Sequence, residues 1–272
     1  MQLGPDSARY LLAGQGERVA RPFHLRWLLP KVCRDNPSRW RAVWLTSWGL
    51  AAVAMWSWSY APTSDWRIAG AATVLLLALP GVLGPTVVRP VGVDLPAMAL
   101  SLVAVALLER GWWPAAAVVI LVAACVQETS PVWAALWAWH PILLVGLAAP
   151  LIRGLFWKPH LDQVTAMPNL REVHDHPVRT ALAAHAGQWR NAWVMVAPWG
   201  ICLAALHRPS WPLIAVLVVA YLQLLVATDT VRLVHTAAGP ALALAAAQVI
   251  PTHWLLLACV VHVVWWRKPE LI

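Results

Sequence analysis

Nine apolar runs constrain the fold of this 272-residue chain more than any other feature. They cover residues 42–58, 68–88, 95–108, 113–126, 132–152, 193–206, 212–227, 236–250 and 254–266. A helix needs about 20 mainly apolar residues to cross roughly 30 Å of hydrocarbon, so the shorter runs also fit re-entrant segments. The pattern predicts an all-α fold, a polytopic transmembrane helix bundle with about nine spans.

The composition excludes an ordinary soluble domain. Apolar residue types make up 60% of the chain and charged types 12%, and the mean hydropathy is +0.63. The 20 tryptophans far outnumber the 3 tyrosines and 2 phenylalanines, and tryptophan prefers the headgroup level of a bilayer. The formal net charge of +8 comes from basic residues clustered at the ends of the apolar runs. This indicates contact with anionic lipid headgroups and argues against nucleic-acid binding.

The polar stretches divide one membrane domain, residues 1–272, into four parts. These are a polar, amphipathic N-terminal segment (1–41), a first helix group (42–152), an interfacial loop (153–190) and a second helix group (191–272). Within the loop, residues 178–185 have the pattern of an interfacial helix. If alternate loops are assigned to opposite sides of the membrane, each side carries about ten lysine and arginine residues. The positive-inside rule therefore does not decide which way the bundle is oriented in the membrane.

The N-terminal segment holds the first candidate site. Asp6 and Tyr10 are four residues apart and would share one face of a helix. Arg26 offers a planar guanidinium that suits phosphate oxygens. A carboxylate beside such cations can stay ionised and serve as a base or a metal ligand. Alternatively, Asp6 caps a short helix and the arginines reach lipid headgroups.

Two further polar stretches interrupt the apolar runs. Gln127 and Glu128 lie between two of them, and an acid at a helix end near lipid is costly unless it is paired or hydrated, which makes it a functional candidate. The alternative is a capping turn in which Ser130 starts the next helix. Asp229 and Arg232 are three residues apart and would meet on one helix face, either as a structural pair or as a site for an anionic headgroup.

Histidines and cysteines do not form a convincing metal site. His174, Asp175 and His176, with His185 downstream, offer suitable atoms, but histidines two apart diverge on a helix, which favours interfacial histidines. Histidines within apolar runs, such as His235, are more often satisfied core residues than ligands. The four cysteines lack CxxC spacing, which indicates small core residues rather than a disulfide framework: Cys33, Cys125, Cys202 and Cys259.

The order of these motifs resembles the GT-C superfamily of polytopic membrane glycosyltransferases of actinobacterial type. There an early extracytoplasmic loop carries the pattern D-x-x-x-Y followed by P-F-x-x-R-x-L-x-P, here Asp6 to Tyr10 and Pro22 to Pro30. Glu128 with its following threonine continues the same order. The resemblance implies inverting transfer of a sugar from a polyprenyl-phosphate carrier at the surface of a bacterial plasma membrane, with the N-terminal segment on the extracytoplasmic side.

The resemblance also implies a role for each candidate residue. Asp6 would be the catalytic base and Glu128 a supporting acid. The substrate-binding residues would be Tyr10, Arg26, Gln127, Asp229 and Arg232, with the two arginines at the lipid phosphate. Membrane lipid and the polyprenyl-phosphate sugar are the implied partners, and a divalent cation is a candidate cofactor. The superfamily has a transmembrane helix ahead of the loop acid, whereas five residues precede Asp6, so we expect either a late start of this sequence or a protein partner that supplies the helix.

A non-catalytic membrane protein is the competing interpretation. In an assembly subunit or a transporter, the acids and arginines would be packing pairs that hold helices together. An enzyme needs Asp6, Arg26 and Glu128 at one site, whereas a scaffold would scatter them. A transporter would place ionisable groups near the middle of the bilayer, but here they lie at the ends of apolar runs. No P-loop, dinucleotide-binding glycine motif or zinc-protease motif occurs, which argues against soluble-type nucleotide chemistry.

Overall fold

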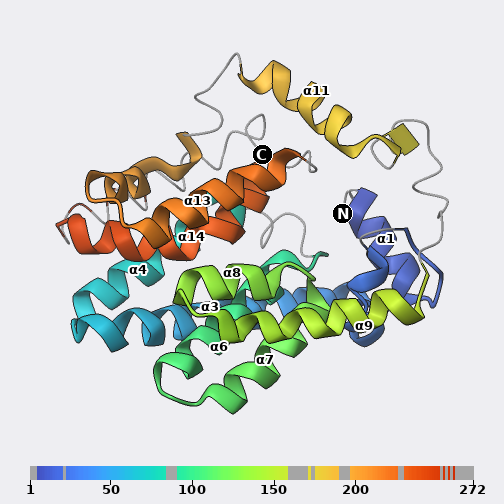
Figure 1. Cartoon of the computed structure of the whole chain (residues 1–272), viewed down its shortest axis with the longest axis horizontal. Coiled ribbons are helices and arrows are strands. Elements are labelled where there is room, and N and C mark those ends of the chain that lie inside the picture. Colours follow the sequence, from blue (N-terminus) through green and yellow to red (C-terminus); the bar gives the residue numbers. More distant parts are fainter. Residues whose placement is uncertain are drawn as a thin grey trace.

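The computed structural model describes residues 5–20, 23–83, 91–158, 171–172, 175–189, 197–225, 230–251, 254, 257 and 260. This described part is helical and contains no β-strand, so the predicted all-α class is confirmed (Figure 1). None of its helices combines the length and the apolar character that crossing a bilayer requires. The membrane-spanning part of the prediction therefore stays a prediction.

Four helices from the first half of the chain form the centre of the bundle. They are α3 (Pro37–Thr63), α4 (Trp66–Ala78), α6 (Asp94–Glu109) and α7 (Trp113–Val126). The side chain of Asn36 accepts hydrogen bonds from the first backbone N–H groups of α3, and Asp65 does the same for α4. α3 packs against α4 and α6, and α6 packs against α7. The predicted runs 42–58, 95–108 and 113–126 all lie within these helices.

The apolar run at 132–152 is not one helix. It forms α8 (Ser130–Ala138), a 3₁₀ helix η2 (Pro141–Leu147) and α9 (Ala148–Phe156). Trp139 ends α8 in the left-handed region with φ of 49°, and Pro141 cannot continue the helical hydrogen bonding. The Nδ1 atom of His140 then accepts from the N–H of Ile142 and starts η2. The chain turns here, so a single span over this run was the wrong expectation.

The second half adds α11 (Pro177–Trp189), η3 (Ala197–His207), α13 (Trp211–Leu222), η4 (Gln223–Leu225) and α14 (Thr230–Val249). The helix expected at 178–185 lies inside α11. α14 packs along α4, where the Nδ1 atom of buried His235 accepts from the N–H of Gly81 at 3.0 Å. That bond satisfies a backbone group just after α4 ends, so His235 is the satisfied core residue that the sequence indicated.

The N-terminal segment folds into α1 (Pro5–Gly14), η1 (Phe23–Leu25) and α2 (Leu28–Cys33). These elements gather at one end of the bundle (Figure 1). Together with residues of α3, α6 and α7 they form a second hydrophobic core, in which Tyr10, Phe23 and Trp40 pack together. The hydroxyl of Ser7 donates to the carbonyl of Val91, which ties α1 to the chain just before α6.

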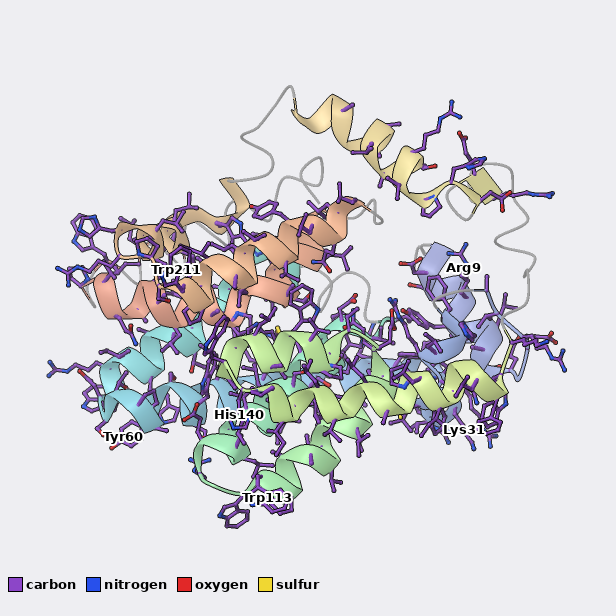
Figure 2. All side chains as sticks on the ribbon, viewed as in Figure 1. Arg9, Lys31, Tyr60, Trp113, His140 and Trp211 are labelled. Carbon is purple, nitrogen blue, oxygen red and sulfur yellow. The ribbon has the colours of Figure 1, made fainter. Side chains whose placement is uncertain are left out.

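Large apolar side chains remain on the surface of the described part. Trp66, Trp113 and Trp211 are 63%, 58% and 80% exposed. Figure 2 shows Tyr60 and Trp211 toward one end of the bundle, and Arg9 and Lys31 at the other, where the N-terminal helices lie.

Candidate functional site

Arg26 joins two motifs that are far apart in the sequence. Its Nε and Nη2 atoms each donate to a carboxylate oxygen of Glu128 at 2.8 Å, and its Nη1 atom donates to the hydroxyl oxygen of Tyr10 at 2.9 Å. The Arg26 and Glu128 side chains are 15% and 17% exposed. Two parallel hydrogen bonds fix both the distance and the plane of such a pair. The N-terminal motif and the Gln127-Glu128 turn thus form one site.

Local structure explains how each partner reaches this place. Tyr10 is on α1 and packs edge-on against Phe23 at a ring distance of 5.3 Å. The guanidinium groups of Arg9 and Arg26 lie over the same Phe23 ring, 4.7 and 5.5 Å from its centre. Glu128 is in the turn between α7 and α8, which the bond from the Ser130 N–H to the Gln127 carbonyl closes. Cation–π contacts and an aromatic core therefore orient Arg26 toward Glu128.

The charges of this group are fixed by their neighbours. Burial opposes ionisation of Glu128, but the charge of Arg26 and its hydrogen bonds outweigh burial and hold the pKa of Glu128 below its ordinary value. Burial likewise opposes the charge of Arg26, and the attraction of Glu128 nevertheless holds the pKa of Arg26 well above its ordinary value. An ionised acid paired in this way is a weak base, so Glu128 suits a supporting role better than proton transfer.

Tyr10 stays protonated. Burial raises its pKa, Arg26 lowers it in part, and the negative charges of Asp94 and then Asp6 raise it further. Both carboxylates therefore lie within electrostatic range of the phenol. Because the arginine can only donate to the Tyr10 oxygen, the phenol keeps its own O–H for donation to an acceptor.

Asp6 lies in the first turn of α1, one turn before Tyr10, as the spacing predicted. Its carboxylate pairs with Arg9 at 3.4 Å and is 41% exposed, whereas the Arg9 side chain is only 9% exposed. Asp6 is thus the accessible acid of the group, next to a buried cation. That position is compatible with a base that meets a substrate from outside.

Asp94 belongs to the same region, and the sequence reasoning missed it. It opens α6, is 4% exposed, and accepts a hydrogen bond from the Gln127 Nε2 atom at 3.1 Å. Neighbouring residues Gln127 and Glu128 therefore contact Asp94 and Arg26 respectively. An acid directly before an apolar run, at residue 94 ahead of 95–108, was the signal that could have identified it.

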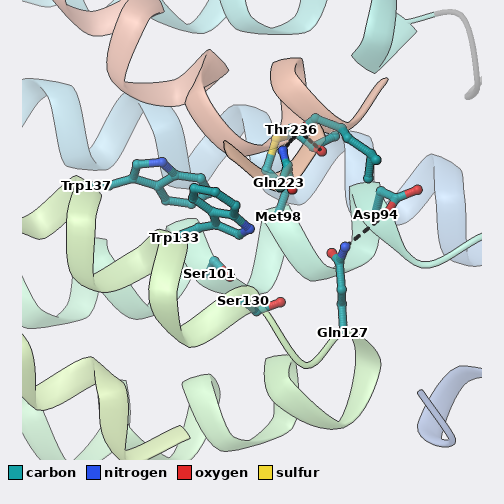
Figure 3. A pocket seen from close by; sticks show the side chains of 10 residues that line it. Asp94, Met98, Ser101, Gln127, Ser130, Trp133, Trp137, Gln223 and Thr236 are labelled. Carbon is teal, nitrogen blue, oxygen red and sulfur yellow. Dashed lines mark hydrogen bonds between the residues drawn. The ribbon is translucent and has the colours of Figure 1, made fainter. Parts of the chain in front are cut away.

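A narrow cavity adjoins Asp94, with room for roughly one water molecule. Figure 3 shows the side chains around it. They come from α6, the turn between α7 and α8, α8, η4 and α14, and they mix hydroxyl, amide and carboxylate groups with apolar surface: Asp94, Met98, Ser101, Gln127, Ser130, Trp133, Trp137, Gln223, Leu233 and Thr236. The predicted residue Gln127 thus lines the cavity, and the next residue in the chain, Glu128, binds Arg26.

The remaining predicted residues are not brought into this site by the described structure. Asp229 lies outside the described residues, and Arg232 is in the first turn of α14 with a side chain that is not described. In the described part no group of three or more histidine, cysteine or acidic side chains could hold a metal ion. Asp175 pairs with Arg171 at 3.5 Å, and His174 lies outside the described residues. Cys33 and Cys202 are buried in the two cores, as expected for small core residues.

Comparison of the chain with protein-family models, with curated protein sequences and with solved structures finds no match.

Proposed function

We propose that the protein is a membrane-associated glycosyltransferase that takes a sugar from a polyprenyl-phosphate donor. The acceptor hydroxyl would lose its proton to the Asp6 carboxylate while its oxygen forms a bond to the sugar's anomeric carbon. The bond from that carbon to the phosphate oxygen would break, and polyprenyl phosphate would leave. Attack from the side opposite the leaving group inverts the anomeric centre.

One observation carries this proposal. Arg26 binds Tyr10, 16 residues before it, and Glu128, 102 residues after it, so residues far apart in the sequence meet at a single place. Asp6 is one helical turn from Tyr10, and Asp94 is linked to the same turn through Gln127. A scaffold has no need to gather an accessible acid, a buried acid and a protonated phenol at one end of its bundle.

The phosphate would meet cations at the edge of this group. Arg26 already donates to Glu128 and Tyr10, so a phosphate would be reached by its other N–H groups. Arg9 lies beside Asp6, and Arg232 is the further arginine that the resemblance to GT-C enzymes suggests. Glu128 would hold the Arg26 guanidinium in one plane while the phosphate binds.

A second candidate function rests on the same ion pair. Because Glu128 occupies two of the Arg26 hydrogen bonds, the pair also fits a purely structural part in a non-catalytic membrane subunit. In that case Arg26 and Glu128 would serve to fasten the N-terminal helices to the turn between α7 and α8.

A transfer assay separates the two functions. The wild type would be reconstituted in liposomes with radiolabelled polyprenyl-phosphate sugars, and the label in the acceptor fraction would be counted. We expect Asp6→Asn to lower transfer by about 10²-fold or more, because a positioned base contributes that much. Asp175→Asn is the matched control, since that acid is exposed and pairs with Arg171 on a different part of the chain. If Asp6→Asn transferred sugar as fast as Asp175→Asn, or if the wild type transferred none, the non-catalytic membrane subunit would be the better explanation.

A further inference from the structure

Two buried serine hydroxyls on the cavity wall have no hydrogen-bond partner in the described part of the chain. Ser101 is 1% exposed and Ser130 is 2% exposed, and the Oγ atom of each is completely covered. Buried hydroxyls in helices usually bond to the carbonyl four residues earlier, as Ser59 does with Met55 at 2.6 Å. Ser101 makes no such bond although it lies within α6. Both hydroxyls line the cavity (Figure 3), and burying them this way costs free energy unless a water molecule or a ligand bonds to them.

Helix periodicity explains why these groups meet. Asp94, Met98 and Ser101 follow one another at intervals of four and three residues along one face of α6. Ser130, Trp133 and Trp137 follow at intervals of three and four residues along one face of α8. Two regular helix faces therefore form much of the cavity wall, and residues of η4 and α14 complete it.

The polar groups around the cavity are arranged mainly to accept hydrogen bonds. Gln127 donates its amide N–H to Asp94, and Gln223 donates its own to the Leu233 carbonyl. Each amide therefore keeps its carbonyl oxygen for a different partner. The two serine hydroxyls can donate or accept. A ligand group with a hydrogen to donate and a lone pair to offer meets all these requirements, and a hydroxyl is the smallest such group.

The rest of the wall selects among ligands. Among the described residues that line the cavity there is no lysine, arginine or histidine, and the Asp94 carboxylate disfavours a phosphate or carboxylate there. Trp133, Trp137 and Met98 supply apolar surface for carbon atoms. The space suits one hydroxyl group, so the carbon atoms of a ligand would stay at the mouth of the cavity.

We infer that this cavity is a binding site for the hydroxyl group of a neutral alcohol or polyol, held by Ser101 and Ser130 beside Asp94. The site is distinct from the Arg26 group, although the Gln127-Glu128 turn borders both. It goes beyond the proposed sugar transfer, because binding of an alcohol here requires no reaction.

The test measures binding directly. Protein labelled with 5-fluorotryptophan and held in a mild detergent would be titrated with ethylene glycol and with glycerol, and the fluorine resonances of Trp133 and Trp137 would be followed by NMR. The two resonances are assigned from Trp133→Phe and Trp137→Phe. Exposed Trp113 reports general solvent effects. We expect saturable shifts at the two cavity tryptophans and a linear drift at Trp113.

Variants of the serines decide whether the cavity is responsible. Ser101→Ala and Ser130→Ala should each weaken binding by about tenfold. Both should fold, because removing a hydroxyl that has no partner leaves no group unsatisfied. Ser57→Ala is the matched control, since the Ser57 hydroxyl is also covered and without a partner in the described part but lies outside the cavity.

Three results would overturn the inference: no saturable shift with either alcohol, shifts unchanged in both serine variants, or shifts produced only by sodium chloride or inorganic phosphate. The binding measurement does not involve sugar transfer. A failed transfer assay would therefore leave the alcohol-binding inference standing, and a failed binding measurement would leave the proposed glycosyltransferase function standing.

Discussion

Removing one partner of the Arg26–Glu128 pair should destabilise the protein much more than removing both. The pair shares two hydrogen bonds of 2.8 Å, and both side chains are mostly buried. Leaving one charge there without its partner should cost about 3 kcal/mol, so Arg26→Met and Glu128→Leu should each lower the free energy of unfolding by about that amount. The double variant replaces both charges with apolar side chains and should lose at most about 1 kcal/mol, which recovers about 5 of the summed loss of about 6 kcal/mol.

The assay is equilibrium denaturation of the wild type, the two single variants and the double variant in a mild detergent, followed by tryptophan fluorescence. The exposed Arg171–Asp175 pair provides a matched control cycle, with an expected coupling energy within about 0.5 kcal/mol of zero. A coupling energy for Arg26 and Glu128 as small as that of the control would refute the reasoning that this pair fastens the N-terminal helices.

Three further perturbations have outcomes that follow from the structure. The pKa of Glu128 is held below its ordinary value of 4.5, so the ionised side chain stabilises the fold above that pH, and this effect is lost as pH falls through the lower pKa of the folded state. The difference in unfolding free energy between wild type and Glu128→Gln should therefore shrink from about pH 7 to about pH 3. A difference that stays constant over this range would contradict the prediction. His235→Phe leaves the N–H of Gly81 without its acceptor and should lower the free energy of unfolding by about 1–3 kcal/mol. His235→Gln keeps an acceptor and should lower it less, as measured by thermal or chemical unfolding. Equal losses in the two variants would show that this hydrogen bond is unimportant. Gly14→Ala would place a Cβ 2.7 Å from backbone atoms that follow α2, so limited proteolysis should cut the N-terminal segment faster than in Gly49→Ala, where the space is open; equal cutting rates would contradict this packing.

The sequence identified the members of the Arg26 group but not their pairing. Tyr10 and Arg26 were found because the N-terminal segment is conspicuously polar, and Glu128 was found because it interrupts two apolar runs. Their contacts depend on how α1, η1 and the turn after α7 pack, and no local spacing determines a contact across 102 residues. The capping turn that was the alternative for the Gln127-Glu128 stretch, with Ser130 starting the next helix, also could not be judged from the sequence alone. α8 does begin there, but the serine hydroxyl caps nothing and faces the cavity.

Helix positions followed from the sequence where caps and prolines reinforced the apolar pattern. α7 has the bounds of its apolar run, and α6 starts one residue before its own. A single span was wrongly predicted for the run at 132–152 because hydrophobicity alone does not show where the chain reverses. The left-handed Trp139 and the cap formed by His140 are local backbone features that a count of apolar residues does not register. Asp94 was missed because it stands alone in the sequence, without the polar neighbours that drew attention to Glu128, although its position before an apolar run was a usable signal.

The most direct test of the central claim, that the Arg26 group is a single site for lipid-linked sugar transfer, is the transfer rate of Glu128→Gln in liposomes. The rate should be measured at a temperature where circular dichroism shows the variant folded. Glu128 orients Arg26, so the account predicts a loss of about tenfold or more relative to Asp175→Asn, because losing one positioned charge-assisted hydrogen bond is worth about that factor. A folded Glu128→Gln protein that transfers sugar as fast as the Asp175→Asn control would contradict it.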